Sequence, residues 1–153
     1  MMNSKSFHIA QVMPEELHAL RRGVLRGGDD DARVDDARDH DAAALHLAGI
    51  DEGVVVVSSS FYPSTSPVTA NASSYQLRYL ATAFTHQRRG LAARVMVVAE
   101  ALLRERGCEE IWANGRDTAL DFYRATGWTC VAGSEHLSPE TQLPHTVIFR
   151  PLP

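Results

Sequence analysis

The feature that most constrains the fold is the segment from Tyr75 to Arg106, because its hydrophobic period changes at a single glycine. Tyr75 to Ala83 alternates between apolar and polar positions, which is the period of a half-buried strand. After a polar turn that ends in Gly90, apolar residues recur at helical spacing: Leu91, Val95, Val98, Leu102 and Leu103. The sequence therefore predicts a strand that leads through a polar turn into a long helix, which Gly107 closes.

The turn between this strand and this helix has the composition of an anion-binding site. It is Gln87-Arg88-Arg89-Gly90-Leu91-Ala92. The first N–H groups of a helix have no intrahelical partner and lie at the positive end of its dipole, and a glycine lets a ligand approach the backbone. Plain helix initiation is the commoner reason for such a glycine. Neither a Walker Gly-Lys-Ser/Thr nor a dinucleotide fingerprint is present.

The periodicity of the whole chain predicts elements in the order β-α-β-β-β-α-β-α-β-β. The predicted strands cover residues 6–12, 42–50, 54–60, 75–83, 111–112, 128–132 and 146–149, and the predicted helices cover residues 14–26, 91–106 and 118–126. This order indicates an α+β fold with a mixed, mostly antiparallel central sheet of about six to seven strands flanked by helices. A chain of this length is expected to form a single domain over residues 1–153.

Composition and charge favour some classes of function over others. The chain has 44% hydrophobic residues and no continuous apolar run of about 20 residues, so we expect no membrane span. The N-terminus lacks the pattern of a secretory signal, which makes a cytoplasmic location the expectation. A net charge of −4 disfavours a nucleic-acid partner. Cys108 and Cys130 are expected to be buried thiols, and no spacing of Cys or His predicts a metal site.

Seven aspartates between Asp29 and Asp41 form the strongest local charge pattern. They are Asp29, Asp30, Asp31, Asp35, Asp36, Asp39 and Asp41. A solvated loop or a short polar helix is the simpler interpretation. The alternative is an electrostatic funnel that attracts a cationic amine.

Two motifs, in the right order, resemble the GNAT superfamily of acetyl-CoA-dependent N-acetyltransferases. The turn Gln87 to Ala92 is similar to the family signature Gln/Arg-x-x-Gly-x-Gly/Ala between a strand and a long helix. About 30 residues later, Ala119 to Trp128 resembles the family's Ala-x-x-Phe-Tyr-x-x-x-Gly-Phe segment. With the element order, the resemblance spans essentially the whole chain. It implies a GNAT-like fold and acetyl-CoA as co-substrate, and it leaves a homodimer open.

The resemblance also implies roles for individual residues in binding the cofactor. The pyrophosphate would be held by the family's loop, which here comprises Gln87, Arg88, Arg89, Gly90, Leu91 and Ala92. Main-chain groups of Leu80 and Thr82 would pair with the pantetheine arm, and Asn114 would face the cofactor from the next strand. Arg116 stands where the family often has asparagine; it could bind a cofactor phosphate or form a surface salt bridge.

The implied reaction is direct attack of a small-molecule or peptide primary amine on bound acetyl-CoA in a ternary complex. Tyr123 occupies the place of the hydroxyl that protonates the departing thiolate, although a core aromatic is the competing interpretation. A backbone N–H near Leu80 can polarise the carbonyl. The candidates for a general base are His46 and His145, for which a core or surface role is the simpler explanation. A non-catalytic acyl-CoA-binding or regulatory module is the alternative function.

Overall fold

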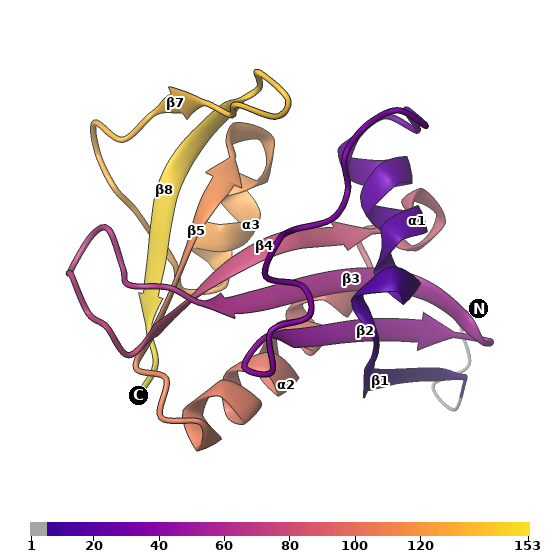
Figure 1. Cartoon of the computed structure of the whole chain (residues 1–153), viewed down its shortest axis with the longest axis horizontal. Coiled ribbons are helices and arrows are strands. Elements are labelled where there is room, and N and C mark those ends of the chain that lie inside the picture. Colours follow the sequence, from indigo (N-terminus) through magenta and orange to yellow (C-terminus); the bar gives the residue numbers. More distant parts are fainter. Residues whose placement is uncertain (1–5) are drawn as a thin grey trace. The chain divides into compact units, whose positions relative to one another are not determined.

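A computed structural model describes residues 6–153, which Figure 1 draws as a cartoon. These residues fall into two compact units. The first unit contains the chain up to Tyr62 together with Tyr79–Leu102, and the second contains Pro63–Arg78 and Leu103–Pro153. Strand β4 (Ser74–Thr82) begins in the second unit and ends in the first. The described residues include no helix that is long and apolar enough to span a bilayer.

The strands of the first unit form an antiparallel series. Strand β1 (Phe7–Gln11) pairs with β2 (Leu45–Asp51), and β2 pairs with β3 (Val54–Pro63). Beyond β3 lies the end of β4, where the Ala83 N–H donates to the Val56 carbonyl. The inner strands are almost fully buried: Leu45, Leu47, Val57 and Phe61 are at most 1% exposed. This apolar layer is the core against which the helices of the unit pack.

Two helical regions cover opposite faces of these strands. The N-terminal one is the 3-10 helix η1 (Pro14–Leu17), the short α1 (His18–Leu20) and the π-helical turn η2 (Arg21–Leu25), where the sequence predicts one continuous helix. It contacts Ser60 of β3 through Arg21. The long α2 (Leu91–Glu105) contacts Phe7 through Arg94, and a side chain at Gly49 would touch both Phe7 and Val57. Since side chains alternate along β3, Ser60 and Val57 lie on opposite faces.

The second unit is built on two long strands that follow the first half of β4 in the sheet order. Strand β5 (Glu110–Arg116) runs parallel to β4 from Ser74–Glu110 to Leu77–Ala113, and β8 (Pro144–Pro151) pairs antiparallel with β5. The short strands β6 (Thr129–Cys130) and β7 (His136–Leu137) both pair with β8. The 3-10 helix η4 (Asp117–Ala119) and helix α3 (Leu120–Ala125) follow β5.

The predicted fold class is confirmed, with corrections in detail. Residues 6–153 contain eight strands in a mixed, mostly antiparallel arrangement flanked by helices. The sequence misses β7, which has two residues and no alternating pattern. It also shortens β5, because polar residues such as Asn114 hide the strand although their backbone continues the ladder with β8. Cys108 is buried, as predicted, but Cys130 is only half-buried, and both thiols are free. One domain over residues 1–153 stays a prediction.

Candidate functional site

The turn before α2 is an exposed loop whose backbone alternates in handedness. Arg88 and Gly90 both have positive φ, +64° and +72°, and residues 87–90 are exposed. Successive N–H groups in such alternating conformations form a concave nest that suits anions. No atom lies within 4 Å of the position that a Gly90 Cβ would occupy, so glycine is needed here for its φ and not for space. The loop therefore has the backbone geometry of an anion-binding nest.

Two side-chain contacts within the first unit hold this loop in place. Gln87 Nε2 donates to the Thr82 carbonyl over 3.1 Å, which links the loop to the end of β4. His86 Nε2 lies 2.9 Å from Asp51 Oδ2, and Asp51 also accepts from the Ser6 hydroxyl. The hydrogen bond from Ser6, followed by that from His86, lowers the pKa of Asp51. The structure thus brings together the predicted cofactor residues of the first unit: Leu80, Thr82, Gln87, Arg88, Arg89, Gly90, Leu91 and Ala92.

Strand β4 carries a backbone irregularity one residue before Leu80. Tyr79 has a φ of +59°, which is unusual for an aromatic residue inside a strand. The Ser58 hydroxyl donates to the Tyr79 carbonyl over 2.6 Å and holds the irregular peptide in place. The ladder with β5 runs from Ser74 to Leu77 and so ends two residues before Tyr79. Such local strain is often found where a backbone group is aimed at a ligand.

Tyr123 of α3 is a buried aromatic in the second unit. Its ring makes edge-to-face contacts with Phe122 and Trp128, each at 5.3 Å between centroids. The Trp128 N–H donates to the Tyr123 carbonyl and holds the chain that follows α3 against it. Burial raises the pKa of Tyr123 well above its ordinary value of 10, so the phenol is neutral at any physiological pH. A neutral hydroxyl can donate a proton or a hydrogen bond.

The two site residues predicted in the second unit, Asn114 and Tyr123, lie on opposite faces of β5, and Gly115 lies against Tyr123. A Cβ at Gly115 would lie 3.0 Å from Ile148 and 3.4 Å from Tyr123, so a larger residue here would crowd both side chains. Asn114 precedes Gly115 in β5, so its side chain points to the opposite face, where it is exposed. The side chains of Tyr123 and Asn114 therefore do not meet. The role of Asn114 at the cofactor stays a prediction.

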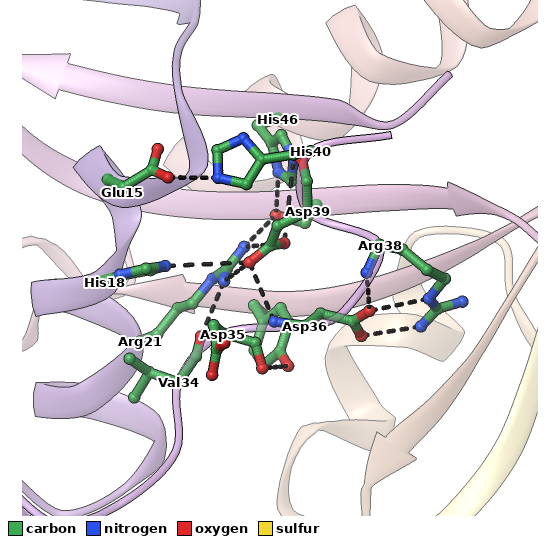
Figure 2. A network of polar contacts seen from close by, with 12 residues as sticks. Glu15, His18, Arg21, Val34, Asp35, Asp36, Arg38, Asp39, His40 and His46 are labelled. Atoms are coloured by element: carbon green, nitrogen blue, oxygen red, sulfur yellow. Dashed lines mark hydrogen bonds and ion pairs between the residues drawn. The ribbon is translucent and has the colours of Figure 1, made fainter. Parts of the chain in front are cut away.

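A buried polar cluster, which the sequence does not predict, lies beside Tyr79 in the first unit. Figure 2 shows Arg21 and Asp39 pointing toward each other at its centre. We call this the Arg21 cluster; its members are Arg21, Asp39, His46, Ser60 and Tyr62. Arg21 is fully buried although it follows the apolar stripe of the predicted helix, at four residues from Leu17. A charged residue on that stripe was the one available signal for the cluster.

The Asp39 carboxylate is the acceptor at the centre of the cluster. It accepts from both terminal nitrogens of Arg21, from the Tyr62 hydroxyl and from the Asp36 N–H. Burial alone would raise the pKa of Asp39, but the hydrogen bonds from Arg21 and Tyr62 outweigh it, and the net pKa is lowered. Burial and the bond to Asp39 raise the pKa of Tyr62. The interpretation of the aspartate run as a solvated loop is therefore wrong for Asp39, whereas Asp29, Asp30, Asp31 and Asp41 are exposed.

The geometry of His46 leaves it no free nitrogen for proton transfer. Nε2 lies 2.7 Å from the Asp39 carbonyl, which can only accept, so Nε2 carries the proton. Nδ1 lies 2.7 Å from the Ser60 hydroxyl, which in turn accepts from Arg21. Burial lowers the pKa of His46 and keeps the ring neutral. His46 is thus a core histidine, and this geometry removes it as a candidate for the general base.

Both ring nitrogens of His46 have hydrogen-bond partners, whereas within residues 6–153 only one ring nitrogen of His145 has one. Its Nδ1 lies 2.8 Å from the Leu143 carbonyl, and its ring lies 6.1 Å from that of His136 across the β7–β8 pair. On β8, His145 pairs with Arg116 of β5, and neighbouring Thr146 bonds Asp117 on the other face. His145 stays a candidate general base.

The sequence profile of the acetyltransferase (GNAT) family matches residues 13–128. That match includes the loop, Asn114 and Tyr123. The chain belongs to this family. It is accordingly a GNAT acetyltransferase with acetyl-CoA as its co-substrate, and the family resemblance of the two motifs is confirmed.

Known proteins similar to this GNAT chain agree with that result. The uncharacterized N-acetyltransferase YitI of Bacillus subtilis is 26% identical over 120 residues, which are 78% of this chain and 80% of YitI. A crystal structure from Lactobacillus plantarum, assigned provisionally to the N-acetyltransferases, has a TM-score of 0.78 at 17% identity and covers 97% of this chain and 99% of its own. The structure of yncA from Salmonella typhimurium with acetyl-CoA has a TM-score of 0.71 at 16% identity, covering 97% and 95%. These structural similarities confirm the fold.

Proposed function

We propose that this GNAT acetyltransferase moves an acetyl group from acetyl-CoA to a primary amine by direct attack in a ternary complex. The observation that carries the proposal is the exposed loop before α2, with left-handed backbone at Arg88 and Gly90. Backbone N–H groups of Arg88 to Ala92 would hold the pyrophosphate, because they lie at the positive end of the dipole of the 15-residue α2. Acetyl-CoA supplies an activated thioester, and the chain has to orient it and stabilise the charges that develop.

Two groups of the chain suit the developing charges. The peptide N–H that follows Tyr79, that of Leu80, is positioned by the strand irregularity and would polarise the acetyl carbonyl. The Tyr123 hydroxyl would donate to the sulfur as it leaves. Because burial raises the Tyr123 pKa above that of a thiol, complete proton transfer to a free thiolate is uphill, and the main contribution is a hydrogen bond that strengthens as charge builds on sulfur.

The substitution Tyr123→Phe tests the catalytic half of this proposal. It keeps the ring contacts with Trp128 and removes only the hydroxyl. We expect kcat to fall by about 100-fold, with the affinity for acetyl-CoA unchanged, in an assay of thiol release with whichever amine of a panel supports turnover. Tyr75→Phe removes another buried phenol and is the matched control, for which kcat should not change. Equal kcat values for Tyr123→Phe and the native chain would remove Tyr123 from the mechanism.

A non-catalytic acyl-CoA-binding or regulatory module is the second candidate. It is favoured because both His46 nitrogens are hydrogen-bonded, so that His46 cannot act as a base, and because Tyr123 packs in an aromatic core. The two candidates differ in one measurement. Binding of acetyl-CoA without thiol release for any amine of a broad panel, including polyamines, amino acids and peptide N-termini, would identify the module. Release with any of these amines identifies the enzyme.

A further inference from the structure

We infer that Arg21 is a positioning residue for acetyl transfer, which holds the left-handed Tyr79 of β4 and thereby fixes the peptide N–H that follows it. The inference rests on the proposed function, in which that N–H polarises the acetyl carbonyl. We do not place Arg21 in contact with the substrate. It acts through the ring of Tyr79, over which its guanidinium lies 4.0 Å from the centroid.

The contacts around Tyr79 hold this residue from two directions. On one side, the Ser58 hydroxyl donates to its carbonyl over 2.6 Å. On the other, the planar Arg21 guanidinium covers its ring. A left-handed aromatic residue persists only where its surroundings over-determine it. The Tyr79 carbonyl and the Leu80 N–H belong to one planar peptide group and point in opposite directions. A shift of the Tyr79 ring that rotates this group would therefore re-aim the Leu80 N–H.

Arg21 is in turn fixed by groups that are far apart in the sequence. Nη1 donates to the Val34 carbonyl over 2.8 Å and to Asp39 over 3.0 Å, and Nη2 donates to Ser60 over 2.8 Å. The guanidinium is fully buried, so solvent does not compete for these bonds. Only a planar fork with several donors can meet all of these acceptors while its face stays on an aromatic ring. Arg21 therefore couples the aspartate-rich loop to the irregularity in β4.

Stability alone is a weak reason for such a group. A buried ion pair can often be replaced by apolar side chains of similar volume at no cost in stability. The Arg21 Nε is moreover buried without an acceptor among residues 6–153, which is an added cost. The Arg21–Asp39 pair carries this cost and lies next to a strained backbone position. A role in placing Tyr79 precisely therefore explains the pair better than a role in stability does.

The test compares the vibrational frequency of the acetyl carbonyl in variants of the whole chain. Acetyl-CoA labelled with carbon-13 at the carbonyl is the probe, and difference infrared spectroscopy of the bound probe is the readout. A hydrogen bond lowers the carbonyl frequency, so the native chain should lower it relative to free acetyl-CoA. In the double variant Arg21→Met with Asp39→Leu, which leaves no orphan charge, the frequency should return most of the way to the free value. The Kd for coenzyme A should change by less than about threefold.

Two further variants separate positioning from general damage. Arg21→Lys keeps the positive charge but loses the fork, and we expect the same loss of the frequency shift with a folded circular-dichroism spectrum. Arg38→Met is the matched control, because Arg38 also pairs with an aspartate, Asp36, and also covers a tyrosine ring, that of Tyr62 at 4.3 Å. It should leave the carbonyl frequency unchanged.

The outcomes distinguish this inference from the function on which it rests. A lowered frequency that is the same in native chain, double variant and Arg21→Lys would overturn the role of Arg21 and leave the proposed function intact. An acetyl-CoA complex whose carbonyl frequency equals the free value in the native chain would overturn the role of Arg21 and the polarisation of the carbonyl by the Leu80 N–H. Absence of thiol release with every amine would overturn the proposed acetyl transfer itself. An equal loss of shift in Arg38→Met would show that any stacked arginine matters, which also overturns the specific role of Arg21.

Discussion

The first unit contains two places where the backbone turns left-handed next to the proposed acetyl-CoA site, and they are built in opposite ways. In the loop before α2, Gly90 adopts its positive φ at no steric cost and in open space, while the contacts of Gln87 with Thr82 and of His86 with Asp51 hold the residues before it. In β4, Tyr79 adopts a positive φ against its own side chain and is held by Ser58 and Arg21. The first site depends on residue type, and the second depends on tertiary contacts.

This difference predicts how each place responds to mutation. A change at the loop should affect the cofactor more than the fold, because few other residues depend on Gly90. A change in the Arg21 cluster should affect the fold first, because its members join the aspartate-rich loop, β2 and β3. Substitutions in the two places should therefore differ in their effects on stability and on cofactor binding.

The largest effect is expected for Asp39→Ala. The substitution leaves the buried Arg21 without its counter-ion and Tyr62 without its acceptor, and the loss of one partner of a buried pair costs about 3–5 kcal/mol of unfolding free energy. Urea denaturation followed by circular dichroism measures it. Asp35→Asn is the control, since Asp35 pairs with Arg33 at the surface and should matter by less than about 1 kcal/mol. Similar values for the two variants would mean that the cluster does not hold the unit together.

A smaller effect on stability is expected for Gly90→Ala. A Cβ at a φ of +72° costs about 1–2 kcal/mol and favours a different loop conformation, which should weaken the binding of coenzyme A measured by calorimetry. Gly107→Ala, at the other end of α2, has a φ of +82° and equally open space, so it is matched in strain. We expect the two variants to lose similar stability and only Gly90→Ala to lose affinity. Equal affinities would place the cofactor phosphates elsewhere.

The smallest effect is a change in pH dependence for His46→Gln. Because burial holds the pKa of His46 below its ordinary value, the unfolded chain binds a proton that the folded chain does not once the pH falls below about 6.5. Stability should therefore fall with falling pH from there to the lower folded pKa, by at most about 1.4 kcal/mol per pH unit for this one proton. The substitution should flatten that slope, and His8→Gln, at an exposed position, should not. An unchanged slope would show that His46 does not titrate in this window.

The same contrast explains what could be predicted from the sequence. The place of the loop Gln87 to Ala92 follows from local information, since a strand period changes to a helix period at one glycine, while its binding of the cofactor stays a prediction. The Arg21 cluster does not, because Arg21, Asp39 and Ser60 meet only after β2, β3 and the aspartate-rich loop have folded. The irregularity at Tyr79 could not be predicted either, since Tyr75 to Ala83 contains no glycine that would indicate a positive φ.

An amide chemical-shift titration of the nitrogen-15-labelled chain with coenzyme A tests binding at the loop before α2 without any knowledge of the acceptor. We predict that the largest shifts occur at Arg88 to Ala92, with further shifts at Leu80 and Thr82, while Gly107 at the far end of α2 stays unchanged. Saturable shifts that cluster elsewhere and spare the loop before α2 would show that coenzyme A does not bind at this loop.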